Sequence, residues 1–212
     1  MKILHLLSTL LTTAAQITHH TASRIIGGTA TDPTRYSYLV SLQTTQHFCG
    51  ATIIAPDVIL TAAHCTIFDY DDVTIQIGGY TVDGEESSGE RVDVVKARRI
   101  YVHPQYDSNI NSNDFALIIL ERPTVAGVQY VRLNDDHLLE MNTLTALGWG
   151  DTTPEDGYDF SNVLREVQVD YVENGVCDAS TDGVDSYEGM IFEEMICASA
   201  AEKDGCQGDS GK

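Results

Sequence analysis

The stretch Asp204-Gly205-Cys206-Gln207-Gly208-Asp209-Ser210-Gly211 is the part of the chain from which fold and function are inferred. A serine hydroxyl is a weak nucleophile, so a catalytic serine needs a neighbouring base and donors for the charge that develops on its substrate. Gly208 and Gly211 flank Ser210 and allow a tight turn, so that backbone N–H groups can point into one small space. Taken alone, the stretch fits a surface turn equally well.

Two upstream segments supply the residue types that a catalytic serine requires. Thr61-Ala62-Ala63-His64-Cys65 contains a histidine, and Asn113-Asp114-Phe115-Ala116-Leu117 contains an aspartate. Each is ordinary by itself, since a histidine after an apolar strand is commonly structural and an Asn-Asp pair commonly forms a turn. With Ile25-Ile26-Gly27-Gly28 behind Arg24, however, the four motifs in this order closely resemble the trypsin and chymotrypsin family of serine endopeptidases. The resemblance runs from Arg24 to the last residue.

The resemblance implies a catalytic role for each residue of the triad. His64 would take the proton of Ser210 and pass it to the leaving amine, while Asp114 would orient the imidazole. The N–H groups of Gly208 and Ser210 would form the oxyanion hole. We expect no cofactor and no metal. A calcium loop, which some relatives have, is left open because Gly78-Gly79 replaces its first acidic position while the acids that follow remain: Glu85, Glu86 and Glu90.

The resemblance also implies substrate specificity and a route of activation. Asp204 occupies the floor of the primary specificity pocket, where a carboxylate pairs with Arg or Lys side chains of a protein or peptide substrate. Cleavage after Arg24 would free the amino group of Ile25 to pair with Asp209. Buried charges of this kind are tolerable only when matched, so the uncut precursor should be inactive. Protein protease inhibitors are expected as further partners, and the protein is expected to be a monomer.

The cysteine count is odd. The resemblance pairs Cys49 with Cys65 and Cys177 with Cys197, which leaves Cys206. A leftover cysteine in a secreted protein can be a free thiol or form an intermolecular bridge. The simpler interpretation is that its partner follows Lys212 and that the sequence is incomplete at its C terminus.

The composition is strongly acidic, with 12 Lys and Arg against 32 Asp and Glu and a net charge of −20. This charge argues against nucleic acid as a partner. Most of the excess lies between residues 155 and 194, where Arg165 is the single basic residue. The acids can simply keep the surface soluble, or they can steer cationic substrates towards the protein.

The N terminus predicts secretion. Lys2 precedes a short apolar run, so residues 1–15 are interpreted as a signal peptide and 16–24 as an activation peptide. The run is too short to span a membrane. The peptidase domain then covers 25–212, with a first half at about 25–125 and a second at about 126–212, and the protein is expected outside the cell.

Short segments rich in β-branched residues predict an all-β fold, either a barrel or a sandwich. They lie at 38–43, 51–54, 58–61, 73–77, 92–95, 115–120, 143–147 and 164–172. The resemblance specifies two packed six-stranded antiparallel barrels joined near 122–134, the second incomplete. His64 and Asp114 then belong to the first barrel and Ser210 to the second.

Residues outside these motifs are assigned structural roles. Trp149 is expected in packing, and His47, His103 and His137 in turns or on the surface. Two other functions remain open: a binding or inhibitor protein on this fold without catalysis, and an adhesive scaffold. The intact set of His64, Asp114 and Ser210 favours the protease over both.

Overall fold

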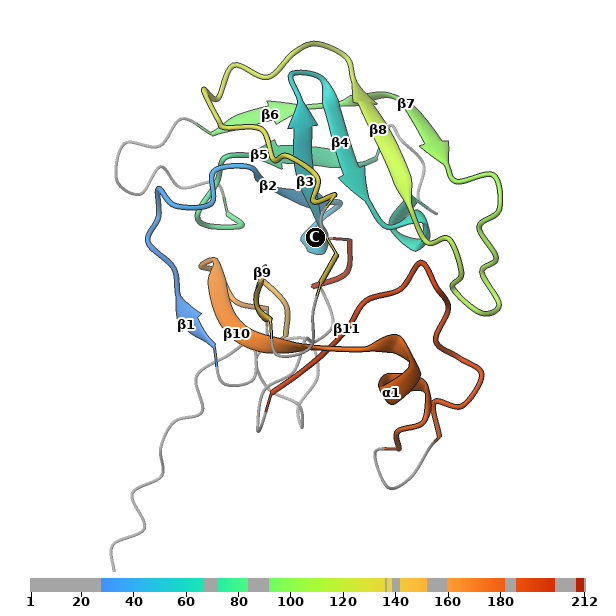
Figure 1. Ribbon diagram of the computed structural model, residues 1–212. Coiled ribbons are helices and arrows are strands. Elements are labelled where there is room, and N and C mark those ends of the chain that lie inside the picture. The colour runs from blue at the N-terminus through green and yellow to red at the C-terminus, as the bar shows by residue number, and fades with distance from the viewer. Residues whose placement is uncertain are drawn as a thin grey trace, which may run out of the picture.

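The protein folds into two antiparallel β-sheets, which form the upper and lower halves of Figure 1. This computed structural model describes residues 28–66, 72–83, 92–135, 137–138, 142–151, 160–181, 186–200 and 209–211. Within those ranges the helical elements are a 3₁₀ turn, η1 (Ala63–Thr66), and one short helix, α1 (Asn174–Asp178). The predicted all-β fold is therefore confirmed. No helix in the described ranges is long and apolar enough to cross a membrane.

The upper sheet curls until its two ends meet. Its strands follow the order β6-β5-β2-β3-β4-β8-β7. Only Lys96 separates β6 from β7, so the first and last strands of the sheet are two halves of one bent strand. Counted this way, the sheet is a closed barrel of six strands, as the resemblance implies. The bounds are β2 (Leu39–Gln43), β3 (His47–Ala55), β4 (Val58–Thr61), β5 (Thr74–Ile77), β6 (Asp93–Val95), β7 (Ala97–Val102) and β8 (Ala116–Leu120).

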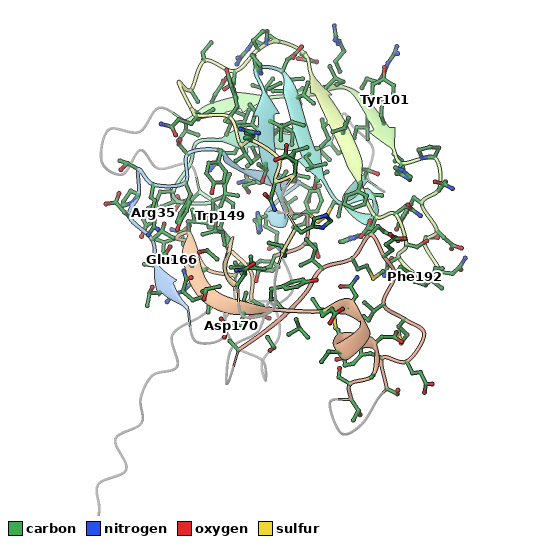
Figure 2. The ribbon with its side chains drawn as sticks, viewed as in Figure 1. Arg35, Tyr101, Trp149, Glu166, Asp170 and Phe192 are labelled. Carbon is green, nitrogen blue, oxygen red and sulfur yellow. A yellow bond between two sulfur atoms is a disulfide. The ribbon has the colours of Figure 1, made fainter. Side chains whose placement is uncertain are left out.

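Strand β2 is buried on both of its faces. Successive side chains of a strand point to opposite sides. Val40 and Leu42 accordingly lie in the core of the upper barrel, whereas Leu39 packs with Trp149 and Leu164 in a second cluster. Trp149 is 1% exposed and lies between the two halves (Figure 2). Its expected packing role is confirmed, and β2 is the strand shared by both cores.

The lower sheet is built around one long strand, β10 (Arg165–Val172). β10 pairs with β1 (Thr29–Ala30) near its start, with β11 (Cys197–Ser199) near its end, and with β9 (Thr143–Gly148) along most of its length. Helix α1 follows β10 directly, and the Cys177–Cys197 disulfide ties that helix to β11.

The prediction for His47 is wrong. This residue opens strand β3 and is 3% exposed. Its ring packs edge-on against Trp149, with centroids 5.6 Å apart, and its Nδ1 lies 2.8 Å from the hydroxyl of Ser41. A buried imidazole needs such a hydrogen-bond partner, and this one comes from the neighbouring strand β2.

Candidate active site

His64 and Asp114 lie just beyond the ends of two neighbouring strands of the upper barrel, β4 and β8. In the pairing of β4 with β8, Thr61 lies opposite Ala116. The turn η1 follows Thr61 and Asp114 precedes Ala116, so both side chains project from the same end of the barrel. The Cys49–Cys65 disulfide fixes η1 to strand β3, because Cys65 is the residue directly after His64.

The carboxylate of Asp114 holds His64 at two points. Oδ1 accepts the backbone N–H of His64 at 2.9 Å, and Oδ2 lies 2.7 Å from Nδ1 of the ring. An acidic partner on one ring nitrogen fixes the tautomer and leaves the other, Nε2, to act as a base. The side chain of His64 is 40% exposed and that of Asp114 22%, so the ring remains accessible while its partner is covered. This arrangement can accept a proton from a nearby hydroxyl.

Tyr106 packs beside the same carboxylate. Burial, followed by the negative charges of Asp114 and Asp107, raises the pKa of its phenol. A phenol is already neutral at physiological pH, and this shift moves its ionisation further from that range.

The segment 209–211 is held against the end of the upper barrel. The carbonyl of Ser210 accepts the N–H of Gly50 at 2.7 Å, and the carbonyl of Gly50 accepts the hydroxyl of Thr61 at 2.9 Å. Gly211 has φ +84°, and a Cβ atom added there would lie 2.4 Å from Thr61 Oγ1. Only glycine fits this approach.

Asp209 anchors the same segment to the lower half. The residue is 6% exposed, and its Oδ1 accepts the N–H of Gly150 at 2.9 Å. A Cβ atom on Gly150 would lie 2.4 Å from the carboxyl carbon of Asp209, so glycine is needed at position 150. Ser210 thus lies between an attachment to the lower half at Asp209 and one to the upper barrel at Gly50.

The structure brings His64 and Asp114 together and attaches the segment that carries Ser210 to the same barrel through Gly50. A hollow of about 260 Å³ is lined by Asp114 and Gly211 together with Thr61 and Ala62. Among the described residues, the hydroxyl of Ser210 makes no hydrogen bond to His64. Such contacts are often long without substrate and shorten when it binds.

Comparisons with known proteins agree with this geometry. The family model for trypsin matches residues 25–212. Anionic trypsin from Canis lupus familiaris is 32% identical over 192 residues, which is 89% of this chain and 72% of the relative. Trypsin from Sarcophaga bullata is 34% identical, and the alignment covers 89% of this chain and 72% of that relative. Hypodermin-B from Hypoderma lineatum is also 34% identical, and the alignment covers 89% of this chain and 71% of that relative.

The chain belongs to the trypsin family. It is therefore a trypsin-like serine protease, a hydrolase whose substrates are proteins or peptides. Both disulfides implied by the family resemblance are formed.

Several residues expected from the trypsin family lie outside the described residues. They are Arg24, Ile25, Asp204, Cys206 and Gly208, the acids Glu85, Glu86 and Glu90, and the segments 1–15 and 16–24. Gly28, close behind Ile25, is described, and its carbonyl accepts a hydrogen bond from the Arg165 guanidinium at 2.9 Å.

One cluster resembles a metal site by distance alone. Potential ligand atoms of Cys49, His64 and Cys65 all lie within 4.8 Å of one another. Both sulfur atoms are consumed in a disulfide, and a metal-binding cysteine must be a free thiolate. The two cysteines thus form a structural disulfide next to His64.

Sequence motifs missed two residues that contact this site. Gly50 binds the carbonyl of Ser210, and Glu194 binds the backbone of Asn113, next to Asp114. Both contacts join residues far apart in the chain, so neither has a local sequence signal. Knowledge of which strands and loops meet is needed to find them.

Proposed function

We propose that this protein is a secreted serine endopeptidase that cleaves peptide bonds after Arg or Lys. The observation that carries the proposal is the two-point grip of Asp114 on His64, in the same region as the segment that bears Ser210. A base with a fixed tautomer, at the end of the barrel to which the serine segment is attached through Gly50, suits acyl transfer.

Catalysis proceeds through an acyl-enzyme. Ser210 Oγ attacks the substrate carbonyl carbon while His64 Nε2 takes its proton, and Asp114 stabilises the imidazolium that forms. The N–H groups of Gly208 and Ser210 bind the oxyanion. His64 then protonates the leaving amine, and a water molecule releases the acyl group by the reverse sequence, which restores Ser210.

Activation by cleavage after Arg24 is part of the proposal. The new amino group of Ile25 enters the protein and pairs with the carboxylate of Asp209. A carboxylate only 6% exposed is stabilised by a matching positive charge. The contact of Arg165 with Gly28 supports this route, since it holds the chain near Ile25 against strand β10. The precursor, lacking this pair, is inactive.

The proposal also includes where the protein acts. Residues 1–15 direct the chain to secretion, and the two disulfides suit an oxidising compartment. The mature protein acts as a monomer outside the cell, and protein protease inhibitors bind the same cleft as substrates.

The nucleophile is tested by Ser210→Ala in protein cut after Arg24. We expect the hydrolysis of Arg and Lys ester and amide substrates to fall by about 10⁴-fold or more, because the attacking oxygen is lost. The measurement is steady-state kinetics, with Ser108→Ala in an exposed turn as the matched control. Equal hydrolysis by the Ser210 variant would remove this residue from the mechanism.

Specificity is tested by Asp204→Ser. The carboxylate at the pocket floor pairs with a cationic side chain, so its loss should lower kcat/KM on Arg and Lys substrates by about 10²-fold or more. Comparison of Arg, Lys and Phe substrates measures the effect, and Asp135→Ser on the surface is the control. An unchanged preference would mean that another group recognises the substrate side chain.

A further inference from the structure

Glu194 belongs to the lower half of the molecule but binds the loop that carries Asp114. It lies in the turn 192–195, between α1 and β11, and its Oε1 accepts the backbone N–H of Asn113 at 3.0 Å. Figure 2 shows the neighbouring Phe192 on this segment. The contact thus joins a residue of the lower half to the peptide next to the acid that grips His64.

The backbone of Asn113 needs this support. Its φ is +53°, in the left-handed region, which asparagine adopts more readily than most residues with a side chain but which still needs local hydrogen bonds to hold it. The carbonyl of Asn113 accepts the N–H of Phe115 at 2.8 Å, and its side chain donates to the carbonyl of Gln105 at 3.2 Å. The Glu194 carboxylate satisfies the remaining backbone group. Hydrogen bonds to a charged acceptor are roughly twice as strong as neutral ones.

The turn that presents Glu194 is itself fixed. Asn174, the first residue of α1, donates through Nδ2 to the carbonyls of Phe192 at 3.0 Å and Met195 at 2.9 Å. The N–H of Met195 also bonds the carbonyl of Phe192 at 3.0 Å. The Cys177–Cys197 disulfide binds α1 to the strand that follows the turn. The backbone of the turn that carries Glu194 is therefore held in place by these hydrogen bonds and by the disulfide.

These contacts form an unbroken series from α1 to the imidazole. Asn174 holds the turn, Glu194 holds Asn113, and Asp114 holds His64 through two hydrogen bonds. We infer that Glu194 is a positioning residue, by which the lower half of the molecule sets the orientation of the Asp114–His64 pair carried by the upper barrel. This inference rests on the proposed function, because the orientation matters only if His64 is the base.

Loss of the Glu194 contact should act on the chemical step. An unsupported Asn113 peptide can rotate, and the carboxylate after it then holds the imidazole less firmly. Small misplacements of catalytic groups cost up to about 10²-fold in rate. Glu194 touches no substrate in this scheme, so kcat should fall while KM stays unchanged.

Three substitutions of Glu194 separate the effect of its side-chain length from the effect of its negative charge. Glu194→Gln keeps the length and an acceptor oxygen, whereas Glu194→Asp keeps the charge but shortens the reach, and Glu194→Ala removes both. We expect the Gln variant to retain kcat within about threefold, and the Asp and Ala variants to lose about tenfold. Glu193→Ala, at the exposed neighbour in the same turn, is the matched control and should behave as wild type. The assay is hydrolysis of a small Arg ester and amide by protein cut after Arg24.

A second readout does not depend on turnover. The proton shared by His64 Nδ1 and Asp114 should give a low-field proton NMR signal, which shifts or broadens in the Asp and Ala variants and is preserved in the Gln variant. Thermal unfolding shows whether each variant is folded. If Glu194→Ala does not fold, the comparison of Glu194→Gln with Glu194→Asp still tests the inference. Wild-type kcat and an unchanged signal in Glu194→Asp, or an equal loss in the Gln variant, would overturn the inference. Activity that survives Ser210→Ala would instead overturn the proposed function.

Discussion

At the scale of single residues, Gly211 sets how closely the serine segment approaches the upper barrel. An added Cβ would lie 2.4 Å from Thr61 Oγ1 and 2.6 Å from the carbonyl of Gly50, at φ +84°. Gly211→Ala should therefore lower the free energy of unfolding by more than about 1 kcal/mol and should also reduce activity, because Ser210 is displaced from Gly50. Urea unfolding and ester hydrolysis measure the two effects.

Gly127 provides the matched control for this substitution. Its φ is +73°, but no atom lies within 4 Å of an added Cβ. Gly127→Ala therefore carries the backbone strain without the clash, and it should lower stability by about 1 kcal/mol while leaving the activity unchanged. Equal loss of activity in both variants would show that strain, rather than close approach, explains the effect at Gly211.

At the scale of elements, strand β6 is clamped to the connection between the two halves. Asp93 is 4% exposed, and its carboxylate binds the Arg122 guanidinium at 2.7 and 2.9 Å and the N–H of Val125 at 2.8 Å. The Arg122 hydrogen bonds, aided by those of Val125 and Thr124, outweigh burial and lower the pKa of Asp93 from 3.8 to about 2.

This clamp should make stability depend on acid pH. Because the folded state lowers the pKa, the stabilisation is fully present above pH 3.8 and is lost as pH falls through about 2. Asp93→Asn should therefore be less stable than wild type at pH 6 by on the order of 2 kcal/mol, and the difference should shrink towards pH 2. Urea unfolding of both proteins from pH 6 to pH 2 measures it.

The exposed Asp32 is the comparison for that series. Its pKa is also lowered, by hydrogen bonds from the backbone and side chain of Thr34 within one turn, but water screens the group fully. Asp32→Asn should change the pH dependence far less than Asp93→Asn. A wild-type to Asp93→Asn difference that stays constant down to pH 2 would contradict the role given to the clamp.

The strands themselves could be predicted largely from the sequence. Alternating β-branched segments located most of them within one or two residues, because burial on one face produces that pattern. Strand β7 (Ala97–Val102) escaped detection, since Arg98 and Arg99 are exposed and interrupt the apolar pattern. The start of β3 escaped as well, because His47 and Gly50 lack the usual strand composition.

At the scale of the whole molecule, the sequence motifs predicted which site residues come together. They did not predict the contacts from other parts of the chain that hold those residues in place. The close approach of His64 to Asp114 followed from family resemblance, and the structure places them 2.7 Å apart. The supports at Gly50, Gly150 and Glu194 could not be predicted, because each joins residues far apart in the chain and depends on where loops cross. Local sequence carries propensity and periodicity, whereas these contacts are set by tertiary packing.

The bend at Lys96 has a consequence for how the upper half assembles. Residues 93–102 pair through β6 with β5, the strand before them, and through β7 with β8, the strand after them. The pairings of β5 with β2 and of β8 with β4 join segments further apart in the chain, and such non-local pairing slows folding, because chain entropy is lost before the contacts form. Until that segment is in place, the ring has two open edges that another molecule could join. Newly made chains are thus most prone to aggregate just before the ring closes.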